Sequence, residues 1–68
     1  MDGQVLKRLR ECRGLTQEQV AHRVGVKREY IAMLEAGTRA NPSLMVLERL
    51  AKALGVSTFR LIEGGRRK

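Results

Sequence analysis

The sequence predicts an all-α domain in which five short helices enclose one core. Apolar residues recur at helical spacing between glycines, residues that favour helix N-termini precede these runs, and no stretch shows the alternation typical of a strand. A chain of 68 residues allows one domain with a marginal core, because so short a chain buries only about 60% of its unfolded surface. We expect residues 1–63 to form this compact domain and residues 64–68 to be a flexible basic tail.

Two helices are expected before Gly25, over about residues 4–13 and 17–24. Gly14 ends the first of them, whose apolar face should consist of Val5, Leu9 and Cys12. Thr16 and Gln19 have the spacing of a capping box at the start of the second, which should bury Val20, Ala21 and Val24. The only cysteine has no partner for a disulfide, so Cys12 is expected to act as a small packing residue.

The third helix and the turn before it have the pattern of a helix–turn–helix. This helix is expected over about residues 28–35, is closed by Gly37, and cannot continue past Pro42. Small Ala21 lies where two helices would cross closely, and Gly25 occupies the turn, where a positive φ is easiest for glycine. The positions that such a unit must bury are all apolar, namely Val20, Val24, Val26, Ile31 and Leu34.

The last two helices are expected to begin after Ser43 and Ser57, which can cap them. The fourth has an apolar stripe formed by Leu44, Leu47, Leu50, Ala51 and Leu54. The short fifth helix should turn Phe59 and Ile62 toward the core and should leave Leu61 surplus to that face.

The formal charge of +7 indicates a polyanionic partner. Nucleic acid, an acidic protein and an anionic membrane surface would all be attracted, and solubility alone is the plainer alternative. No apolar run approaches the roughly 18 residues of a membrane span, and the first residues form no signal peptide. A lone cysteine suits a reducing compartment. We therefore expect a cytoplasmic protein that does not interact with membranes.

Catalysis is not expected. The chain has one histidine, His22, and one aspartate, Asp2, and its serines lie at expected helix caps. Neither a carboxylate pair, a nucleophile–base pair nor a phosphate-binding glycine loop is visible. One histidine and one cysteine are too few ligands for a metal site. We expect no cofactor, no metal and no small-molecule effector.

Further segments extend the helix–turn–helix pattern over about residues 6–62. They are RGLTQEQVA (13–21), YIAMLEAG (30–37), NPSL (41–44) and LERLAKALGVS (47–57). Together they resemble the Xre-type family of phage lambda repressor and Cro, which implies a five-helix lambda-repressor-like DNA-binding domain. The resemblance also implies a salt bridge between Arg10 and Glu35. The helical wheel agrees, because Glu35 lies about 70° from the inward direction of the third helix, where a carboxylate needs a cation.

The exposed side of the third helix should enter the major groove of DNA, as in other helix–turn–helix proteins. Arg28 can donate two hydrogen bonds to guanine, and Glu29 can accept one from cytosine or hold Arg28 in position. Ala32 and Met33 can pack against thymine methyl groups. The plainer reading is a solvated charged face with Met33 as a gap-filler.

Contacts to the DNA backbone are expected around this helix. Gln17 lies in the first turn of the second helix, where free amides and the helix dipole favour a phosphate, and the resemblance implies the same role. Lys27 and Tyr30 can reach phosphate or sugar, although the Tyr30 ring can instead cover the edge of the core. Further candidates are Arg13 and Arg23, together with Arg39 and Asn41, which match a phosphate-contacting loop of the family.

The resemblance further implies a transcriptional regulator that binds a pseudo-palindromic operator as a homodimer. Phe59, Leu61 and Ile62 are the candidate dimer interface. A phage-type repressor, a controller protein of a restriction–modification system and an antitoxin-like autoregulator all fit this pattern. The alternative is an antitoxin-like or bridging protein-interaction module, whose acidic partner the basic charge would attract.

Overall fold

The computed structural model describes residues 1–39 and 42–63 of the chain. Within these ranges it has five helices and no strand, which confirms the predicted all-α class. The helices are α1 (Gly3–Cys12), α2 (Gln17–Val24), α3 (Arg28–Ala36), α4 (Leu44–Leu54) and α5 (Thr58–Glu63). The predicted contact at Asn41 and the predicted tail over residues 64–68 lie outside the described residues.

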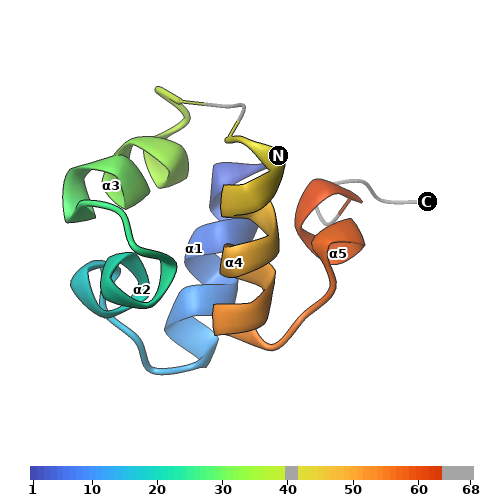
Figure 1. Ribbon diagram of the computed structural model, residues 1–68, viewed down its shortest axis with the longest axis horizontal. Coiled ribbons are helices and arrows are strands. Elements are labelled where there is room, and N and C mark those ends of the chain that lie inside the picture. The colour runs from blue at the N-terminus through green and yellow to red at the C-terminus, as the bar shows by residue number, and fades with distance from the viewer. Residues whose placement is uncertain (40–41, 64–68) are drawn as a thin grey trace.

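Helix α4 lies at the centre of the fold, with the α2–α3 pair on one side and α5 on the other (Figure 1). Helix α1 packs against α3, and α2 packs against both α3 and α4. Gly25 ends α2 with a φ of 86°, as expected for a sharp turn into α3. In the described part of the chain, every helix falls short of the length and apolarity that crossing a bilayer requires.

Side chains fix the start of most helices. Thr16 accepts a hydrogen bond from the main-chain N–H of Gln19 at 3.0 Å, and the Gln19 side chain accepts one from the N–H of Thr16 at 2.8 Å. The predicted capping box is thus confirmed. Ser43 and Ser57 also accept bonds from main-chain N–H groups three residues further on. Such caps contribute about 1 kcal/mol each.

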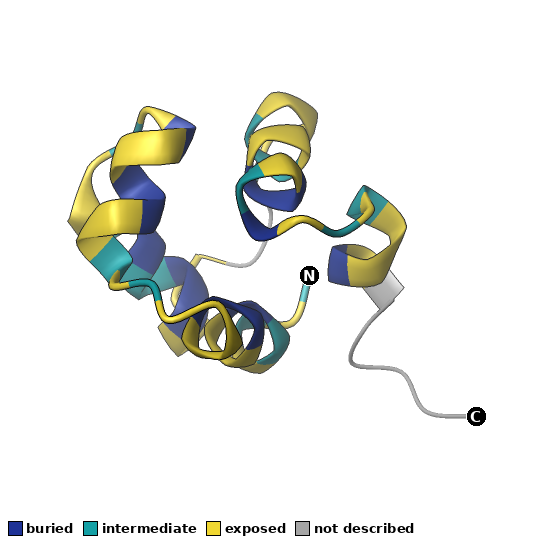
Figure 2. Cartoon of the chain, turned by 90° about the horizontal axis from the view of Figure 1, so that it is seen from below, coloured by how far each residue is buried: buried dark blue, intermediate teal, exposed yellow. Residues whose placement is uncertain are grey.

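All five helices contribute to one core, with their buried residues turned toward each other (Figure 2). The fully enclosed side chains come from the apolar positions of each helix, namely Leu6, Val20, Val24, Ile31, Leu34, Leu50, Leu54 and Leu61. The expected burial of Val20, Ala21 and Val24 in α2 is confirmed.

The predicted core face of α1 is confirmed at Leu9 and wrong at Cys12, whereas Val5 packs only against the edge of the core. Leu6 and Leu9 are buried, whereas Val5 is half-buried and Cys12 is exposed. Val5 and Cys12 each lie about 100–120° around the helix from Leu6, at 100° per residue. The helix instead turns Arg10 inward beside the two leucines, and it does so because Arg10 has a buried partner on α3.

Four apolar residues of the later helices were also assigned to the wrong side. Leu44, expected in the buried stripe of α4, lies in the first turn of that helix and is 65% exposed. In α5, Leu61 is fully buried, whereas Phe59 is 71% exposed and Ile62 is 45% exposed. Phe59 and Leu61 are about 200° apart on a helix, so a single-sided contact with α4 can bury only one of them.

Two arginines bind main-chain carbonyls at the C-terminal ends of other helices. Arg13 donates from Nε to the carbonyl oxygen of Leu54 at 2.8 Å, at the end of α4. Arg49 donates from Nη1 to the carbonyl oxygen of Val24 at 3.3 Å, at the end of α2. The last carbonyls of a helix lack partners within it, so these contacts join helices while satisfying exposed acceptors.

Helix α1 approaches the end of α3 at Gly3, without an intervening side chain. A Cβ atom at position 3 would overlap the carbonyl oxygen of Leu34 and would lie 2.6 Å from that of Glu35. Only glycine permits this approach, which brings α1 and the last turn of α3 together.

We expect Gly3→Ala to lower the free energy of unfolding by about 1–3 kcal/mol, as overpacking does elsewhere. Alanine would otherwise favour a helical position by about 1 kcal/mol, so the two effects have opposite signs. Thermal unfolding followed by circular dichroism measures the outcome. Gln4→Ala, at the next and exposed position, is the matched control and should have little effect. A raised melting temperature for Gly3→Ala would contradict the close approach.

Candidate nucleic-acid interface

Helix α3 has a buried side and an outward side, and the outward side carries the predicted base-contacting residues. The buried residues are Ile31, Leu34 and Glu35. On the outward side, the N-terminal turn exposes Arg28 and Glu29, with Lys27 exposed just before it. Ala32 and Met33 follow and are half-buried. The helix therefore presents charged groups at its start and small or flexible apolar groups one turn later.

Arg10 of α1 and Glu35 of α3 form a buried ion pair. Arg10 donates from Nε to Glu35 Oε2 at 2.6 Å and from Nη2 to Oε1 at 3.1 Å, which is a bidentate arrangement. The two side chains are only 10% and 4% exposed. Arg10 also donates from Nη1 to the carbonyl oxygen of Leu15 at 2.8 Å. The predicted salt bridge thus joins α1, α3 and the connection that leads into α2.

The environment of Arg10 stabilises its charge. The hydrogen bond to Glu35 raises the pKa of Arg10 above its ordinary value, and the negative charge of Glu35 adds to this, whereas desolvation acts in the opposite direction. A cation with a raised pKa keeps its stabilising contribution until the pH rises past that value. Arg10 is therefore charged throughout the neutral range.

A chain of hydrogen bonds leads from this ion pair to the start of α3. Gln17 donates from Nε2 to Glu35 Oε1 at 3.0 Å, and its Oε1 accepts from Arg28 Nη1 at 3.2 Å. A carboxylate can only accept and a guanidinium can only donate, so the two ends of the Gln17 amide match their partners. Arg28 is exposed, yet its head is linked through Gln17 and Glu35 to the buried Arg10.

Tyr30 and Arg39 form a second pair on the flank of α3. The guanidinium carbon of Arg39 lies 5.6 Å from the centre of the Tyr30 ring, which is cation–π geometry. The main-chain N–H of Arg39 also donates to the carbonyl oxygen of Met33 at 3.2 Å. The Tyr30 ring packs against the core, as the alternative reading allowed. It thus forms a platform that orients Arg39.

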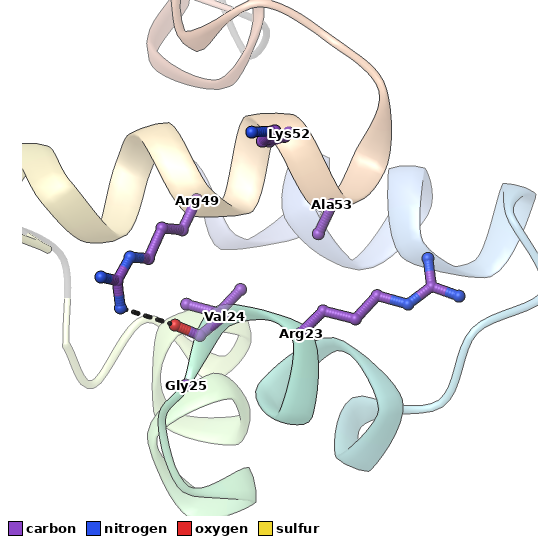
Figure 3. A pocket seen from close by; sticks show the side chains of 6 residues that line it. All are labelled: Arg23, Val24, Gly25, Arg49, Lys52 and Ala53. Atoms are coloured by element: carbon purple, nitrogen blue, oxygen red, sulfur yellow. Dashed lines mark hydrogen bonds between the residues drawn. The ribbon is translucent and has the colours of Figure 1, made fainter.

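The structure places the remaining predicted residues elsewhere. Arg13 binds the end of α4 through Leu54, and Arg23 lines a cleft between α2 and α4 (Figure 3). Phe59 and Ile62 are exposed on α5, but Leu61 is enclosed in the core and is corrected as a candidate for the dimer interface. Among the described residues, no group of three or more potential metal ligands is present.

Sequence reasoning missed the contact between Gln17 and Arg28. A helical wheel relates residues within one helix, but these two lie on different helices and meet only when α2 and α3 pack. The sequence pattern assigned Gln17 to phosphate and Arg28 to a base, each without the other. The structure couples the two residues.

The chain has relatives among known protein families and solved structures. The helix-turn-helix family model matches residues 6–61. The "Uncharacterized HTH-type transcriptional regulator y4dJ" of Sinorhizobium fredii is 47% identical over 60 residues, which cover 88% of this chain and 77% of that protein. The transcriptional regulator SinR of Bacillus subtilis is 32% identical, and the match covers 93% of this chain but only 57% of SinR.

Solved structures share the arrangement of helices. A crystal structure of SinR in complex with DNA superposes with a TM-score of 0.86 at 32% identity, covering 91% of this chain and 98% of that one. The restriction-modification controller protein C.AhdI from Aeromonas hydrophila has a TM-score of 0.82 at 41% identity, covering 87% of this chain and 88% of that one. The family match over residues 6–61, on a fold with this turn at Gly25, shows that the chain belongs to the helix-turn-helix family.

Proposed function

We propose that this chain is a transcriptional regulator that binds double-stranded DNA in a sequence-specific manner through the outward side of α3. The observation that carries this proposal is the hydrogen-bonded chain from Arg10 through Glu35 and Gln17 to Arg28. It supports an exposed guanidinium at the start of α3, the part of a recognition helix that reaches base edges. The relatives named as transcriptional regulators and the DNA complex of SinR support the same function.

Base contacts follow from the chemistry of the outward side. Arg28 has five N–H donors and uses one on Gln17, so a bidentate contact with guanine O6 and N7 remains within its capacity. Glu29 accepts from cytosine N4. Ala32 and Met33 pack against thymine methyl groups one turn further along.

Backbone contacts surround the base contacts. Gln17 stands in the first turn of α2, where main-chain N–H groups and the helix dipole favour a phosphate. Lys27 lies exposed at the start of α3, and Arg39 is oriented by Tyr30. The charges of Arg13 and Arg23 add a longer-range attraction. The relatives named above come from bacteria, in which the chromosome lies in the cytoplasm, so we propose a cytoplasmic location.

A homodimer is proposed because one domain reads only one half-site. Large apolar side chains that remain exposed are Leu44 and Met45 on α4 and Phe59 and Ile62 on α5. Phe59 and Ile62 lie on the same short helix and are 71% and 45% exposed, so both can contact a second copy of the chain. We propose Phe59 and Ile62, without Leu61, as the centre of the dimer interface.

Selection of bound sequences from random duplexes tests the proposed function directly. We expect an inverted repeat, and we expect Arg28→Ala to relax the preference at one base pair in each half-site, at a cost of about 1–3 kcal/mol for the preferred base. Lys27→Ala is the matched control. It should weaken all sequences alike and reduce the dependence of log affinity on log salt by about 0.9 for each phosphate that is no longer neutralised. An unchanged sequence preference for Arg28→Ala would remove this residue from base reading.

The role of the buried ion pair can be separated from its effect on folding. Glu35→Gln leaves Arg10 buried without a counter-charge, so we expect a loss of about 3 kcal/mol of stability or more. The double variant Arg10→Met/Glu35→Leu replaces both charges with apolar groups and should recover the melting temperature. Its DNA affinity should nevertheless stay reduced, because Gln17 has lost the acceptor that holds it. Recovery of full affinity in the double variant would show that the chain of hydrogen bonds does not position Arg28.

Measurement of self-association tests the proposed dimer interface on α5. Phe59→Asp places a charge on a side chain that is already exposed, so the domain should remain folded while the dimer dissociation constant rises about tenfold or more in sedimentation equilibrium. Leu61→Asp is the contrasting variant and should unfold the domain, since Leu61 is fully buried. An unchanged dissociation constant for Phe59→Asp would place the interface elsewhere.

A further inference from the structure

A basic cleft of about 450 Å³ lies between the C-terminal end of α2 and the C-terminal half of α4 (Figure 3). Its floor is apolar or small, being formed by Val24, Gly25 and Ala53. Its rim carries three cations, Arg23, Arg49 and Lys52. The cleft lies at the opposite end of α2 from Gln17, and the interactions proposed for α3 make no use of Arg49 or Lys52.

The negative ends of two helices offset only part of the positive charge in this cleft. Arg49 is bound to the last turn of α2 through the carbonyl oxygen of Val24, and the C-terminal end of a helix carries roughly half a negative charge. Arg23 and Lys52 lie in the last turns of α2 and α4. Two helix ends thus contribute about one negative charge in total, against three formal positive charges on the rim.

Carboxylates do not neutralise the positive charge that remains on the rim of the cleft. Within the described part of the chain, both ion pairs shorter than 4.0 Å involve Arg10, which does not line this cleft. Glu48 lies four residues before Lys52, which is the spacing of a favourable helical pair, yet the two do not come within that distance in the described ranges. The cleft is therefore a positively charged hollow with an apolar floor.

We propose that this cleft binds an acidic segment of a partner protein, an interaction that goes beyond the proposed DNA binding. The side chains of Arg49 and Arg23 point away from each other (Figure 3), which suits an extended ligand better than a compact anion. An extended segment can place one carboxylate at each end and a small apolar side chain on the floor between. The ridge of a DNA backbone is convex and offers no side chain to the floor at Gly25 and Ala53.

The bond from Arg49 to Val24 prepares the site for such a ligand. It fixes the direction of the guanidinium and uses one of its five N–H donors. Gly25 lies directly beside this guanidinium, because a Cβ atom there would be in van der Waals contact with Nη1 of Arg49 at 3.4 Å. Less side-chain entropy is then lost when a carboxylate binds.

The test uses the whole chain, labelled with nitrogen-15, and a short peptide of alternating Glu and Ala as the probe. We expect saturable amide shifts in NMR at Val24, Gly25 and Ala53. A peptide of alternating Gln and Ala is the uncharged control and should cause none. Inorganic triphosphate and a random-sequence DNA duplex are titrated in parallel to identify other anionic ligands.

Lys52→Glu should weaken peptide binding about tenfold, because it replaces an attraction with a repulsion. Lys7→Glu makes the same charge change on the exposed side of α1, outside the cleft, and should leave the peptide affinity nearly unchanged. The affinity of Lys52→Glu for the random duplex should match that of Lys7→Glu. Shifts confined to α3, binding of triphosphate in place of the peptide, or a selective loss of DNA affinity in Lys52→Glu would each overturn the proposal.

Discussion

The arrangement of the first three helices depends on the ion pair between Arg10 and Glu35. The two residues are 25 positions apart and are both buried, so the pair closes α1 onto α3 across the start of α2. Burying two charges costs several kcal/mol each unless other partners compensate. Here the carboxylate accepts three hydrogen bonds and the guanidinium also binds the carbonyl oxygen of Leu15. The polar atoms of the pair thus have hydrogen-bond partners, and Glu35 Oε1 also accepts the bond from Gln17.

A buried charge is an unusual choice in so small a core, where an apolar pair would fill the same space. An apolar pair has no preferred direction, whereas a bidentate ion pair fixes the angle between two helices and the rotation of each. The close approach at Gly3 has the same consequence, since it brings the backbone of α1 onto the last turn of α3. The base contact that we propose for Arg28 requires such a fixed direction, because bidentate contacts tolerate little misplacement.

The positions of the helices and their caps could be predicted from the sequence. Which side of each helix is buried could not always be predicted. Capping residues and glycines act on their own neighbours, so the helices and the capping box at Thr16 were found. Cys12 and Leu61 were assigned to the wrong sides because short helices carry apolar residues on two sides. Only the neighbouring helix selects between these sides. The contact between Gln17 and Arg28 joins two helices and depends on their packing, which no periodicity within one helix reports.

The two ends of α2 have opposite charge preferences, so they suit different ligands. Its N-terminal end carries the positive side of the helix dipole and Gln17, which suits a phosphate, whereas its C-terminal end attracts cations. Eight residues at 1.5 Å each place these ends about 12 Å apart, longer than the screening length of about 8 Å at physiological ionic strength. A ligand at one end is then felt only weakly at the other. In our proposal the acidic segment binds at the C-terminal end of α2 while α3 remains available to DNA, and Arg23 is the one cation that serves both ligands.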